Sequence, residues 1–353
     1  MESRISVMRR PYGPPLHRAR RNPPWHVSSE PIAMTLLSEL WDTTRMRLLV
    51  EIDRRGSLSA AAQAIGIGQP SASQHLRTLE TAAGQRLVER NGRGSRLTEG
   101  GRVLATHAGQ ALAMLAAGEQ ELTALAGLQT GTIRLGASTA PGSYLLPDTL
   151  GCFRRDYPGV DVEIEIAASG EILRRLLSGR IELAIVGVDK ADERIALEPF
   201  LADEIVGVAK AGLVETHDGT LDPKALAELT LLCREPDSSS RAYVERELQR
   251  IGVRPARVWE LGSTEAVKRA VREGLGVGFL SRYAVAEETE RGELDVFRLR
   301  GRPPLTRDFH IARLTSRPFS PAESAFVATL TRCCAKQSAY AEACVAGSGS
   351  RSA

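Results

Sequence analysis

The chain has 353 residues, the length of two or three domains, and its 42% hydrophobic and 25% charged residues are typical of a globular protein. A net charge of only +3 does not mark the whole molecule as a nucleic-acid-binding protein, so any basic surface has to be local. No stretch approaches the ~20 apolar residues of a membrane span, which predicts a cytoplasmic protein without a membrane partner. The five cysteines show no CxxC spacing, which argues against a disulfide framework and against a zinc site.

Residues 1–33 are rich in arginine and proline and lack an apolar run long enough for a signal peptide. We expect this segment to be disordered. Two interpretations stay open. Translation starts at Met34, where the first periodic apolar segment begins, or the segment is a real basic extension that contacts DNA.

Residues 34–97 form short helical segments and are predicted to be a separate domain. Gly56 ends the first helix, whose apolar stripe is Met46, Leu49 and Val50. Ser59 is the expected cap of a second helix that ends at Ile65, and the turn at residues 66–68 leads into a third. Helix, turn and helix follow one another as in a DNA-binding motif.

The third helix, IGQPSASQHLRTLE, has a narrow apolar face made by Ala72, Leu76 and Leu79. Its other positions suit a DNA groove, because glutamine amides pair with adenine and serine or arginine side chains reach bases and phosphates. Pro70 in the first turn costs no hydrogen bond, and the helix start can bind a phosphate. A merely solvated polar face is the alternative. The outward-facing residues are Gln69, Ser71, Ser73, Gln74 and Arg77.

The segment RLVERNGRGSRLTEGG follows, and it reads as two short extended runs around an Asn-Gly turn. Three arginines gather at this turn: Arg90, Arg93 and Arg96. A basic hairpin beside a helix-turn-helix is a wing, and its tip would lie against phosphates or in the minor groove.

At this point the chain resembles a known family. The segment from Gly56 to Gly101 is similar to the winged helix-turn-helix of LysR-type transcriptional regulators. The resemblance implies a linker helix, an effector domain shaped like a periplasmic binding protein, and DNA contacts that also include Ser57 and Pro70. Gly68 departs from the pattern, since a serine usually caps this recognition helix, and the loss is a few tenths of a kcal/mol.

Residues 98–130 are predicted to form a continuous linker helix for dimerisation. Its apolar and small residues follow a 4-3 spacing that is typical of a coiled-coil seam: Leu104, Ala108, Ala111, Leu115, Gly118, Leu122 and Leu125. The small residues would let a partner helix come close. An amphipathic helix packed on its own domain is the alternative.

Residues 131–338 are predicted to be a two-lobed α/β effector domain. Short β-rich runs alternate with amphipathic helices, which indicates parallel βα units. Lobe I comprises about 131–193 and 305–338, and lobe II about 194–304. The expected strands are TIRLGAS, DVEIEIA, ELAIVG, EIVGVAK, TLLCRE, ARVWELG and GVGFLS. Residues 339–353 lose the pattern and are predicted to be a disordered tail.

Polar clusters follow several of these strands, where ligands bind in open α/β sheets. Ser138 and Thr139 follow the first strand, and residues 237–241 bring three serines, a helix start and Arg241 together as an anion site. A capped helix start with spare serines is the alternative. Ser263 belongs to a third cluster. The resemblance also implies ligand contacts at Ser138, Thr139, Ser238, Ser240 and Ser263.

The segments ASTAPGSYLLP and REPDSSSR are similar to the branch of the family that includes carbon-fixation and sulfite-responsive regulators. Asp237 and Ser239 replace glycines of that pattern, and an acid at 237 would oppose an anion.

The resulting hypothesis is a sequence-specific DNA-binding transcription regulator controlled by a small anionic metabolite bound between the lobes. Its partners would be double-stranded DNA with an interrupted inverted repeat, a second copy in a dimer or tetramer, and RNA polymerase as a further candidate. An enzyme is the competing class, but the segment GLGVG lacks a dinucleotide fingerprint, and no metal or nucleophile motif appears. We therefore expect no catalytic residues, no metal and no cofactor. A plain solute-binding protein would have no use for the winged domain.

Overall fold

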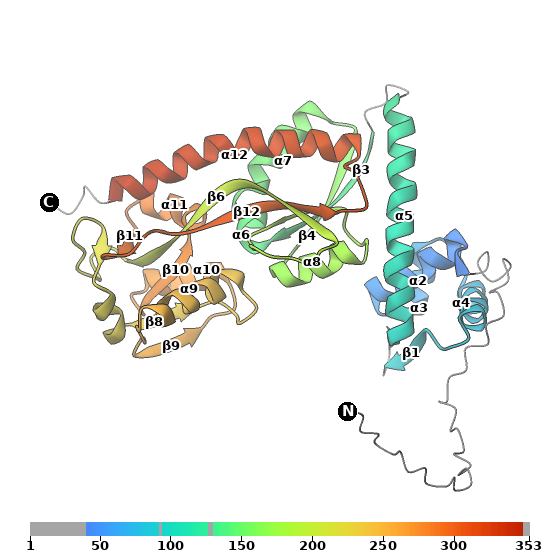
Figure 1. Ribbon diagram of the computed structural model, residues 1–353, viewed down its shortest axis with the longest axis horizontal. Helices are drawn as coiled ribbons and strands as arrows, with labels where there is room; N and C mark the ends of the chain where they lie inside the picture. Colours follow the sequence, from blue (N-terminus) through green and yellow to red (C-terminus); the bar gives the residue numbers. More distant parts are fainter. Residues whose placement is uncertain (1–39, 92–93, 126–129, 349–353) are drawn as a thin grey trace, which may run out of the picture.

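The computed structural model describes residues 40–91, 94–125 and 130–348 (Figure 1). The predictions for residues 1–33 and for Arg93 lie outside the described residues. A small helical domain and a larger α/β domain are joined by one long helix, which stands upright at the right of Figure 1. None of the helices described combines the length and the apolarity that crossing a membrane requires.

The small domain consists of α2 (Thr43–Arg55), α3 (Leu58–Ala64), α4 (Gln69–Ala83) and a hairpin of β1 (Val88–Asn91) and β2 (Gly94–Leu97). Asp42 caps α2 by accepting a hydrogen bond from the Arg45 amide at 3.0 Å, and Gly56 ends it in the left-handed conformation at φ 64°. The buried face of α2 is wider than predicted. It includes Leu48 and Ile52, whereas Val50 is only half-buried.

The predicted start of the second helix is wrong by two residues. Ser57, not Ser59, is its cap, because the Ser57 hydroxyl accepts a hydrogen bond from the amide of Ala60 at 3.4 Å. α3 therefore begins at Leu58, whose side chain packs against the core of the domain. Both serines are acceptable caps in the sequence, and the packing of Leu58 decides between them.

The linker helix α5 (Glu99–Leu125) starts directly after the hairpin. The Thr98 hydroxyl caps it by accepting from the amide of Gly101 at 3.0 Å. Its first turns pack on the small domain, where Leu104 and Ala105 join the core. The predicted helix extended to residue 130, but residues 126–129 lie outside the described residues.

The large domain is built on a 10-stranded mixed sheet, in the order β4-β3-β5-β12-β6-β10-β8-β9, with β11 pairing β6 and β7. The strands are β3 (Gly131–Ser138), β4 (Val160–Ala167), β5 (Leu183–Val186), β6 (Ile195–Lys210), β7 (Thr220–Leu221), β8 (Thr230–Cys233), β9 (Arg257–Glu260), β10 (Val277–Ser281), β11 (Leu294–Leu299) and β12 (Leu305–Leu314). The helices are α6 (Thr139–Tyr144), α7 (Leu146–Asp156), α8 (Ser169–Leu177), the 3-10 helix η1 (Pro223–Glu228), α9 (Ser239–Arg250), α10 (Thr264–Arg272), α11 (Arg282–Glu290) and α12 (Pro321–Ser348).

Two long antiparallel strands, β6 and β12, run through both lobes and join them (Figure 1). β12 has a bulge between Phe309 and His310. In lobe I the core is centred on Phe153, Phe309 and Phe326, and in lobe II on Phe279 and Phe297. Each lobe thus has its own core, which lets the lobes keep their shape if the angle between them changes.

All seven predicted strands are present, but the sequence reading missed β7, β11 and β12. The prediction of a disordered tail is wrong for residues 339–348, because α12 continues to Ser348. Residues 349–353 lie outside the described residues.

Candidate DNA-binding and ligand-binding sites

The recognition helix α4 shows one thin buried face, as the sequence predicted. Ala72 and Leu79 are buried in the core of the small domain, and Leu76 packs against it. The predicted DNA-contacting residues Gln69, Pro70, Ser71, Gln74 and Arg77 are exposed, and Ser73 is half-buried. A row of exposed glutamine, serine and arginine side chains on one helix is the arrangement that reads base edges in a major groove.

Gly68 is the N-terminal cap of α4 and makes no side-chain cap hydrogen bond. Its φ of -69° and ψ of 150° are extended values that any residue adopts. Pro70 lies in the first turn, where a missing N–H leaves no hydrogen bond unmade. The first turn of α4 therefore presents its free N–H groups without a competing side chain, as a phosphate-binding helix start does.

The wing is fixed to the recognition helix by one carboxylate. Glu80 of α4 accepts hydrogen bonds from the amides of Leu87 and Val88, at 2.9 and 3.3 Å. On the far strand Arg96 is exposed and lies opposite Glu89 in the pairing. The side chains of Arg90 and Arg93 lie outside the described residues, so the predicted basic tip is represented by Arg96 alone.

The side chains of the predicted seam of the linker helix are only partly exposed. Leu104 is half-buried against the small domain and Ala108 is buried, whereas Leu115 and Leu122 are 55% and 69% exposed. Ala111 is half-buried, and the side chain of Leu125 lies outside the described residues. The exposed part of the seam is therefore its second half.

A cleft of about 230 Å³, including its open mouth, lies between the two lobes. It sits where β3, β4 and β8 end and where α6, α8 and α9 begin, which is the position of ligands in open α/β sheets. Its lining is rich in hydroxyl groups and holds two arginines: Ser138, Thr139, Ala140, Ala168, Ser169, Arg234, Ser238, Ser239, Ser240 and Arg307.

Polar groups of the two lobes contact each other across this cleft. Arg234, directly after β8 in lobe II, donates from Nη2 to Oγ1 of Thr139 in lobe I at 3.1 Å and also pairs with Glu235. The hydroxyl oxygens of Ser169 and Ser239 lie 3.4 Å apart. A ligand that enters between the lobes would exchange these contacts for its own.

Arg307 supplies the second positive charge and is held by a buried ion pair. Its Nη2 lies 2.9 Å from Oδ2 of Asp203, its Nε donates to the same oxygen at 3.0 Å, and Nη1 lies 3.4 Å from the Ser239 hydroxyl. Ser281 donates to the other Asp203 oxygen at 2.7 Å. Burial raises the pKa of Asp203, and the Arg307 guanidinium opposes that rise. The pair fixes the guanidinium with one N–H directed at the cleft.

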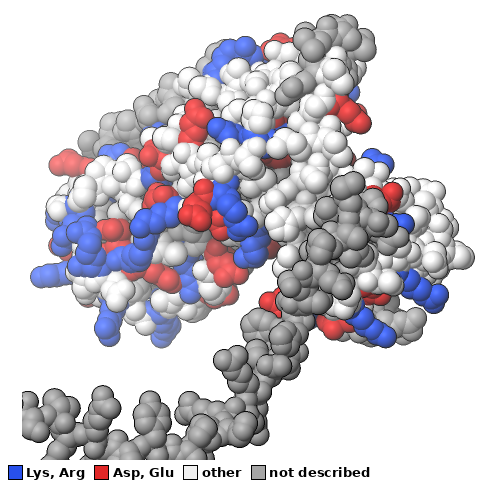
Figure 2. Space-filling model, turned by 45° about the vertical axis from the view of Figure 1, so that its right-hand side comes forward, with Lys and Arg blue, Asp and Glu red and all other residues white. Residues whose placement is uncertain are grey.

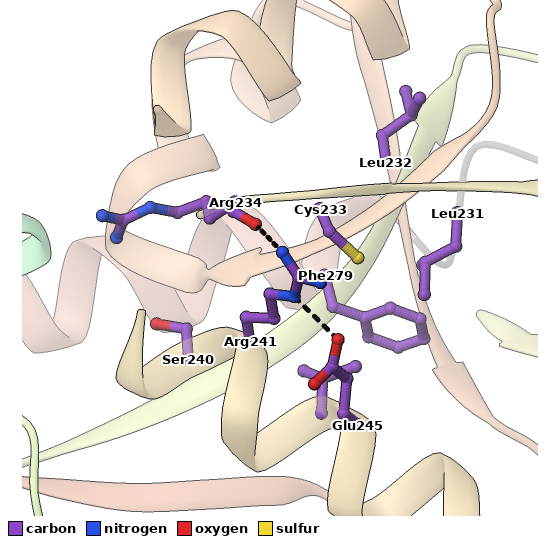
Figure 3. Close-up of a pocket in the computed structure, with 9 residues that line it drawn as sticks. Leu231, Leu232, Cys233, Arg234, Ser240, Arg241, Glu245 and Phe279 are labelled. Atoms are coloured by element: carbon purple, nitrogen blue, oxygen red, sulfur yellow. Dashed lines mark hydrogen bonds and ion pairs between the residues drawn. The ribbon is translucent and has the colours of Figure 1, made fainter. Parts of the chain in front are cut away.

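Ser138, Thr139, Ser238 and Ser240 line the cleft as predicted, but Arg241 does not. Its guanidinium bonds to Glu245 at 2.7 Å, to Glu260 at 3.0 Å and to the carbonyl oxygen of Arg234 at 2.6 Å. Figure 3 shows it in a neighbouring hollow of lobe II, from which the side chain of Arg234 points away. Arg241, the predicted cleft arginine, and Arg234, the actual one, are thus close in sequence, but only Arg234 points into the cleft.

Ser263 is also absent from the cleft lining. It is exposed and caps α10 by accepting from the amide of Ala266 at 3.1 Å. Asp237, which was expected to oppose an anion, is exposed and does not line the cleft.

Ser239, one of the three serines of the predicted anion site, lines the cleft, whereas Ser169, Arg234 and Arg307 were not predicted as cleft residues. The rule that selected Ser138 would also have selected Arg234, because Arg234 follows a strand in the same way. Arg307 lies within β12, and nothing in its neighbourhood in the sequence marks the face to which it points.

Charge on the large domain is mixed. On the face drawn in Figure 2, lysines and arginines alternate with acidic side chains over this domain instead of forming one basic field. Within the described residues, no three histidine, cysteine or acidic side chains come together as metal ligands would.

Two family descriptions match the chain. "LysR substrate binding domain" matches residues 126–335, and "Bacterial regulatory helix-turn-helix protein, lysR family" matches residues 43–102. The "Probable RuBisCO transcriptional regulator" of Cyanidium caldarium is 30% identical over 250 residues, which span 69% of this chain and 79% of that protein. The predicted resemblance to the carbon-fixation branch is confirmed.

Solved structures share the same architecture. A full-length OxyR variant from Pseudomonas aeruginosa has a TM-score of 0.69 at 22% identity and covers 83% of this chain and 95% of that one. The regulatory domain of Synechocystis CcmR in complex with 2-PG has a TM-score of 0.53 at 28% identity and covers 57% of this chain and 97% of that one. The predicted fold class is confirmed by these similarities.

One family description covers the small domain with the start of the linker helix, and the other covers most of the α/β domain. The relatives are regulators and not enzymes. The chain therefore belongs to the LysR family of transcriptional regulators, which bind DNA through a helix-turn-helix domain and respond to a small molecule in the substrate-binding domain.

Proposed function

We propose that the cleft between the lobes binds a small anionic metabolite through Arg234 and Arg307. The observation that carries this proposal is the presence of two guanidinium groups in one cleft, with side chains only 11% and 4% exposed. Guanidinium groups held out of water recognise carboxylates and phosphates with paired, charge-assisted hydrogen bonds.

The start of α9 adds further donors to this site. Ser238 caps the helix, and the hydroxyls of Ser239 and Ser240 lie beside the same cleft. A helix start surrounded by hydroxyls favours an anion, because its first N–H groups have no partner within the helix. The described residues that line the cleft include no acidic side chain, and the carboxylates that pair with its two arginines, Glu235 and Asp203, are not part of the lining.

The cleft is narrow, because its space is only about 230 Å³ even when the open mouth is included. A ligand between the lobes would therefore be small or would move the lobes apart. The CcmR regulatory domain, which shares this fold, is described in complex with 2-PG. We therefore choose 2-PG and inorganic phosphate as the first probes for this chain.

Calorimetric titration of the full chain with 2-PG and with inorganic phosphate tests the site. We expect Arg234→Gln to weaken binding of the better probe by about tenfold or more, since a hydrogen bond to a charged group contributes about 1.5–3 kcal/mol. Arg254→Gln is the matched control, because Arg254 is exposed in lobe II and does not line the cleft. Equal losses in both variants, or no binding of either probe to the wild type, would contradict the proposal.

For the small domain we propose that α4 reads base edges through Gln69, Gln74 and Arg77, while Arg96 contacts the backbone. The exposure of all four side chains supports this assignment. Ser71 and Ser73 would reach bases or phosphates, and Ser57 would reach a phosphate while it caps α3. Replacing Arg96 by alanine should reduce the salt slope of DNA binding by about 0.9 in log units, as expected for one phosphate contact.

We also propose that the exposed half of the linker helix binds a second copy of the chain. Its large apolar side chains on the surface include Met114, Leu115 and Leu122. A dimer would match an operator with an interrupted inverted repeat, and two dimers would form a tetramer. Sedimentation of Leu115→Glu tests this idea, because a charge in the seam should produce monomers.

RNA polymerase stays a candidate partner of the bound regulator, and we assign no surface to it. We infer a cytoplasmic location, because the DNA that a bacterial regulator binds lies there.

A further inference from the structure

Helix α8 joins the ligand cleft to the linker helix. Its amino end lines the cleft through Ala168 and Ser169. Its carboxyl end, at residues 177–179, lies against α5 (Figure 1). A helix of nine residues spans about 13.5 Å, so two functional surfaces are one short rigid element apart.

The contact between α8 and α5 is made by backbone atoms. A methyl group added at Gly109 of α5 would overlap the carbonyl oxygen of Ser178, and one added at Gly179 would come within 2.5 Å of the carbonyl carbon of Gly109. Gly179 also needs to be glycine because its φ is +69°. The two segments therefore touch with no side chain between them, and neither can move toward the other without moving it.

A hydrogen bond locks this contact. The side-chain amide of Gln110 on α5 donates to the carbonyl oxygen of Leu177 at 2.7 Å. That carbonyl belongs to the last turn of α8, where no later N–H of the helix is available to it. The linker helix thus supplies the partner that the end of α8 lacks.

The body of α8 is held firmly on lobe I. Ile172 and Leu176 are fully buried beneath it, and a methyl group at Gly136 of β3 would come within 2.9 Å of Ile172. Arg175 ties the helix to Glu165 of β4 at 2.7 Å. A close-packed helix of this kind moves as one piece and does not bend.

At its other end α8 meets lobe II. The hydroxyl of Ser169, the first residue of α8, lies 3.4 Å from that of Ser239, the first residue of α9. A change in the angle between the lobes would alter this contact at Ser169. Because α8 is close-packed, a displacement of its first residue would be passed along the helix to residues 177–179, which lie against the linker helix.

We propose that α8 is the element that couples the state of the cleft to the linker helix, through the contact of Gly109 and Gly179. This inference rests on the proposed function, in which a ligand occupies the cleft. The contact lies within one chain and therefore acts in each subunit by itself. It would set the direction in which each linker helix leaves its effector domain, and so the placement of the DNA-binding domains.

A wedge in the cleft tests the coupling without a ligand. Ser239→Trp should hold the lobes apart, and its effect on DNA affinity can be measured in the full chain with a duplex that the wild type selects from a random pool. We expect the wedge to change Kd about fivefold or more in the wild type, and less than about twofold when Gly109→Ala is also present.

Gly151→Ala is the matched control, since Gly151 lies in helix α7 of lobe I, outside the seam, with no atom within 4 Å of an added methyl group. In that background the wedge should act as in the wild type. An equal response to the wedge in both glycine variants, or no response in any background, would overturn the proposal. Gln110→Ala offers a second route if Gly109→Ala does not fold, because it removes the hydrogen bond without adding volume. Circular dichroism and thermal melting show whether each variant folds.

The failure of this inference is distinguishable from that of the proposed function. The wedge needs no ligand, so a wild type that binds neither 2-PG nor phosphate leaves the coupling test intact. Conversely, the chain could bind the ligand normally while Ser239→Trp changes DNA affinity equally with and without Gly109→Ala. That result would contradict α8 as the transmitting element and leave the cleft as proposed.

Discussion

The recognition helix and the ligand cleft gather their residues in opposite ways. The exposed groups of α4 come from one stretch, residues 69–77, whereas the cleft collects residues 138–140, 168–169, 234, 238–240 and 307. On a helix the period of 3.6 tells which side chains share a face. In a sheet, long-range strand pairing determines which residues lie together, and no short segment of the sequence shows this pairing. The residues of the DNA-binding site can therefore be predicted from one segment, whereas those of the cleft are identified only from the folded structure.

The largest expected effect tests the residue that only the fold reveals. Arg307→Ala leaves the carboxylate of Asp203 buried and without its ion-pair partner, which should destabilise the α/β domain by about 3–5 kcal/mol. Urea unfolding followed by circular dichroism measures the loss. If Arg307 were merely a surface residue of β12, the loss would be less than about 0.5 kcal/mol.

Two further variants make this experiment more specific. The double variant Arg307→Ala with Asp203→Ala should recover much of the stability, because no charge stays buried alone. Arg302→Ala, a change at an exposed arginine shortly before β12, should leave the unfolding midpoint nearly unchanged. A double variant no more stable than Arg307→Ala would show that packing, and not the charge, accounts for the loss.

The same contrast explains how much the sequence could predict. In β4 acidic residues alternate with β-branched ones, and β10 is a short, mostly apolar run, so both strands were found. The strands β11 and β12 carry charged residues such as Arg298, Arg307 and Asp308, which conceal the alternation until their partners are known. Arg234 was within reach of the rule that found Ser138. The choice between Arg234 and Arg241 depends on side-chain direction, which the sequence does not show.

At the recognition helix the expected effect is smaller and concerns specificity. Gln69→Ala should cost about 1–3 kcal/mol of discrimination at one base pair of the operator and leave the melting temperature unchanged, since the side chain is exposed. Competition binding with single-base operator variants measures it. Gln63→Ala, at an exposed position on α3, is the control and should not alter base preference. A uniform loss over all sequences in Gln69→Ala would assign Gln69 to the phosphate backbone instead.

The hydrogen bond between the lobes at Tyr144 should contribute about 1 kcal/mol to the free energy of unfolding. Its hydroxyl on α6 donates to Glu265 on α10 at 2.6 Å, so Tyr144→Phe should loosen lobe closure. Burial and this hydrogen bond raise the pKa of Tyr144 above its usual value near 10. The stabilisation is therefore complete below pH 10 and is lost as the pH rises through the folded-state value.

Denaturation of Tyr144→Phe and wild type at pH 7 and at higher pH measures this difference. The difference in the free energy of unfolding between the two proteins should become smaller at alkaline pH. Tyr157→Phe is the control, because the Tyr157 hydroxyl has no hydrogen bond to any part of the chain that the structure describes, and its ring stacks on Phe153. A gap that stays constant with pH would mean that the hydroxyl acts through packing alone.

The smallest effect concerns the cap at which the recognition helix departs from its family. Gly68 has extended backbone angles, and an added Cβ would lie 3.7 Å from the Cδ of Pro70, so Gly68→Ser fits without strain. The new hydroxyl should protect the α4 amides by a few tenths of a kcal/mol, which hydrogen exchange can measure. Gly84→Ser, at the other end of the same helix, has as much space but a φ of +65°, and should cost about 1 kcal/mol. Opposite signs at the two ends would show that backbone angle, and not volume, governs these glycines. If Gly68→Ser instead abolished DNA binding, Gly68 would be needed for close approach of the backbone to a phosphate, and its role would be in DNA binding and not in helix capping.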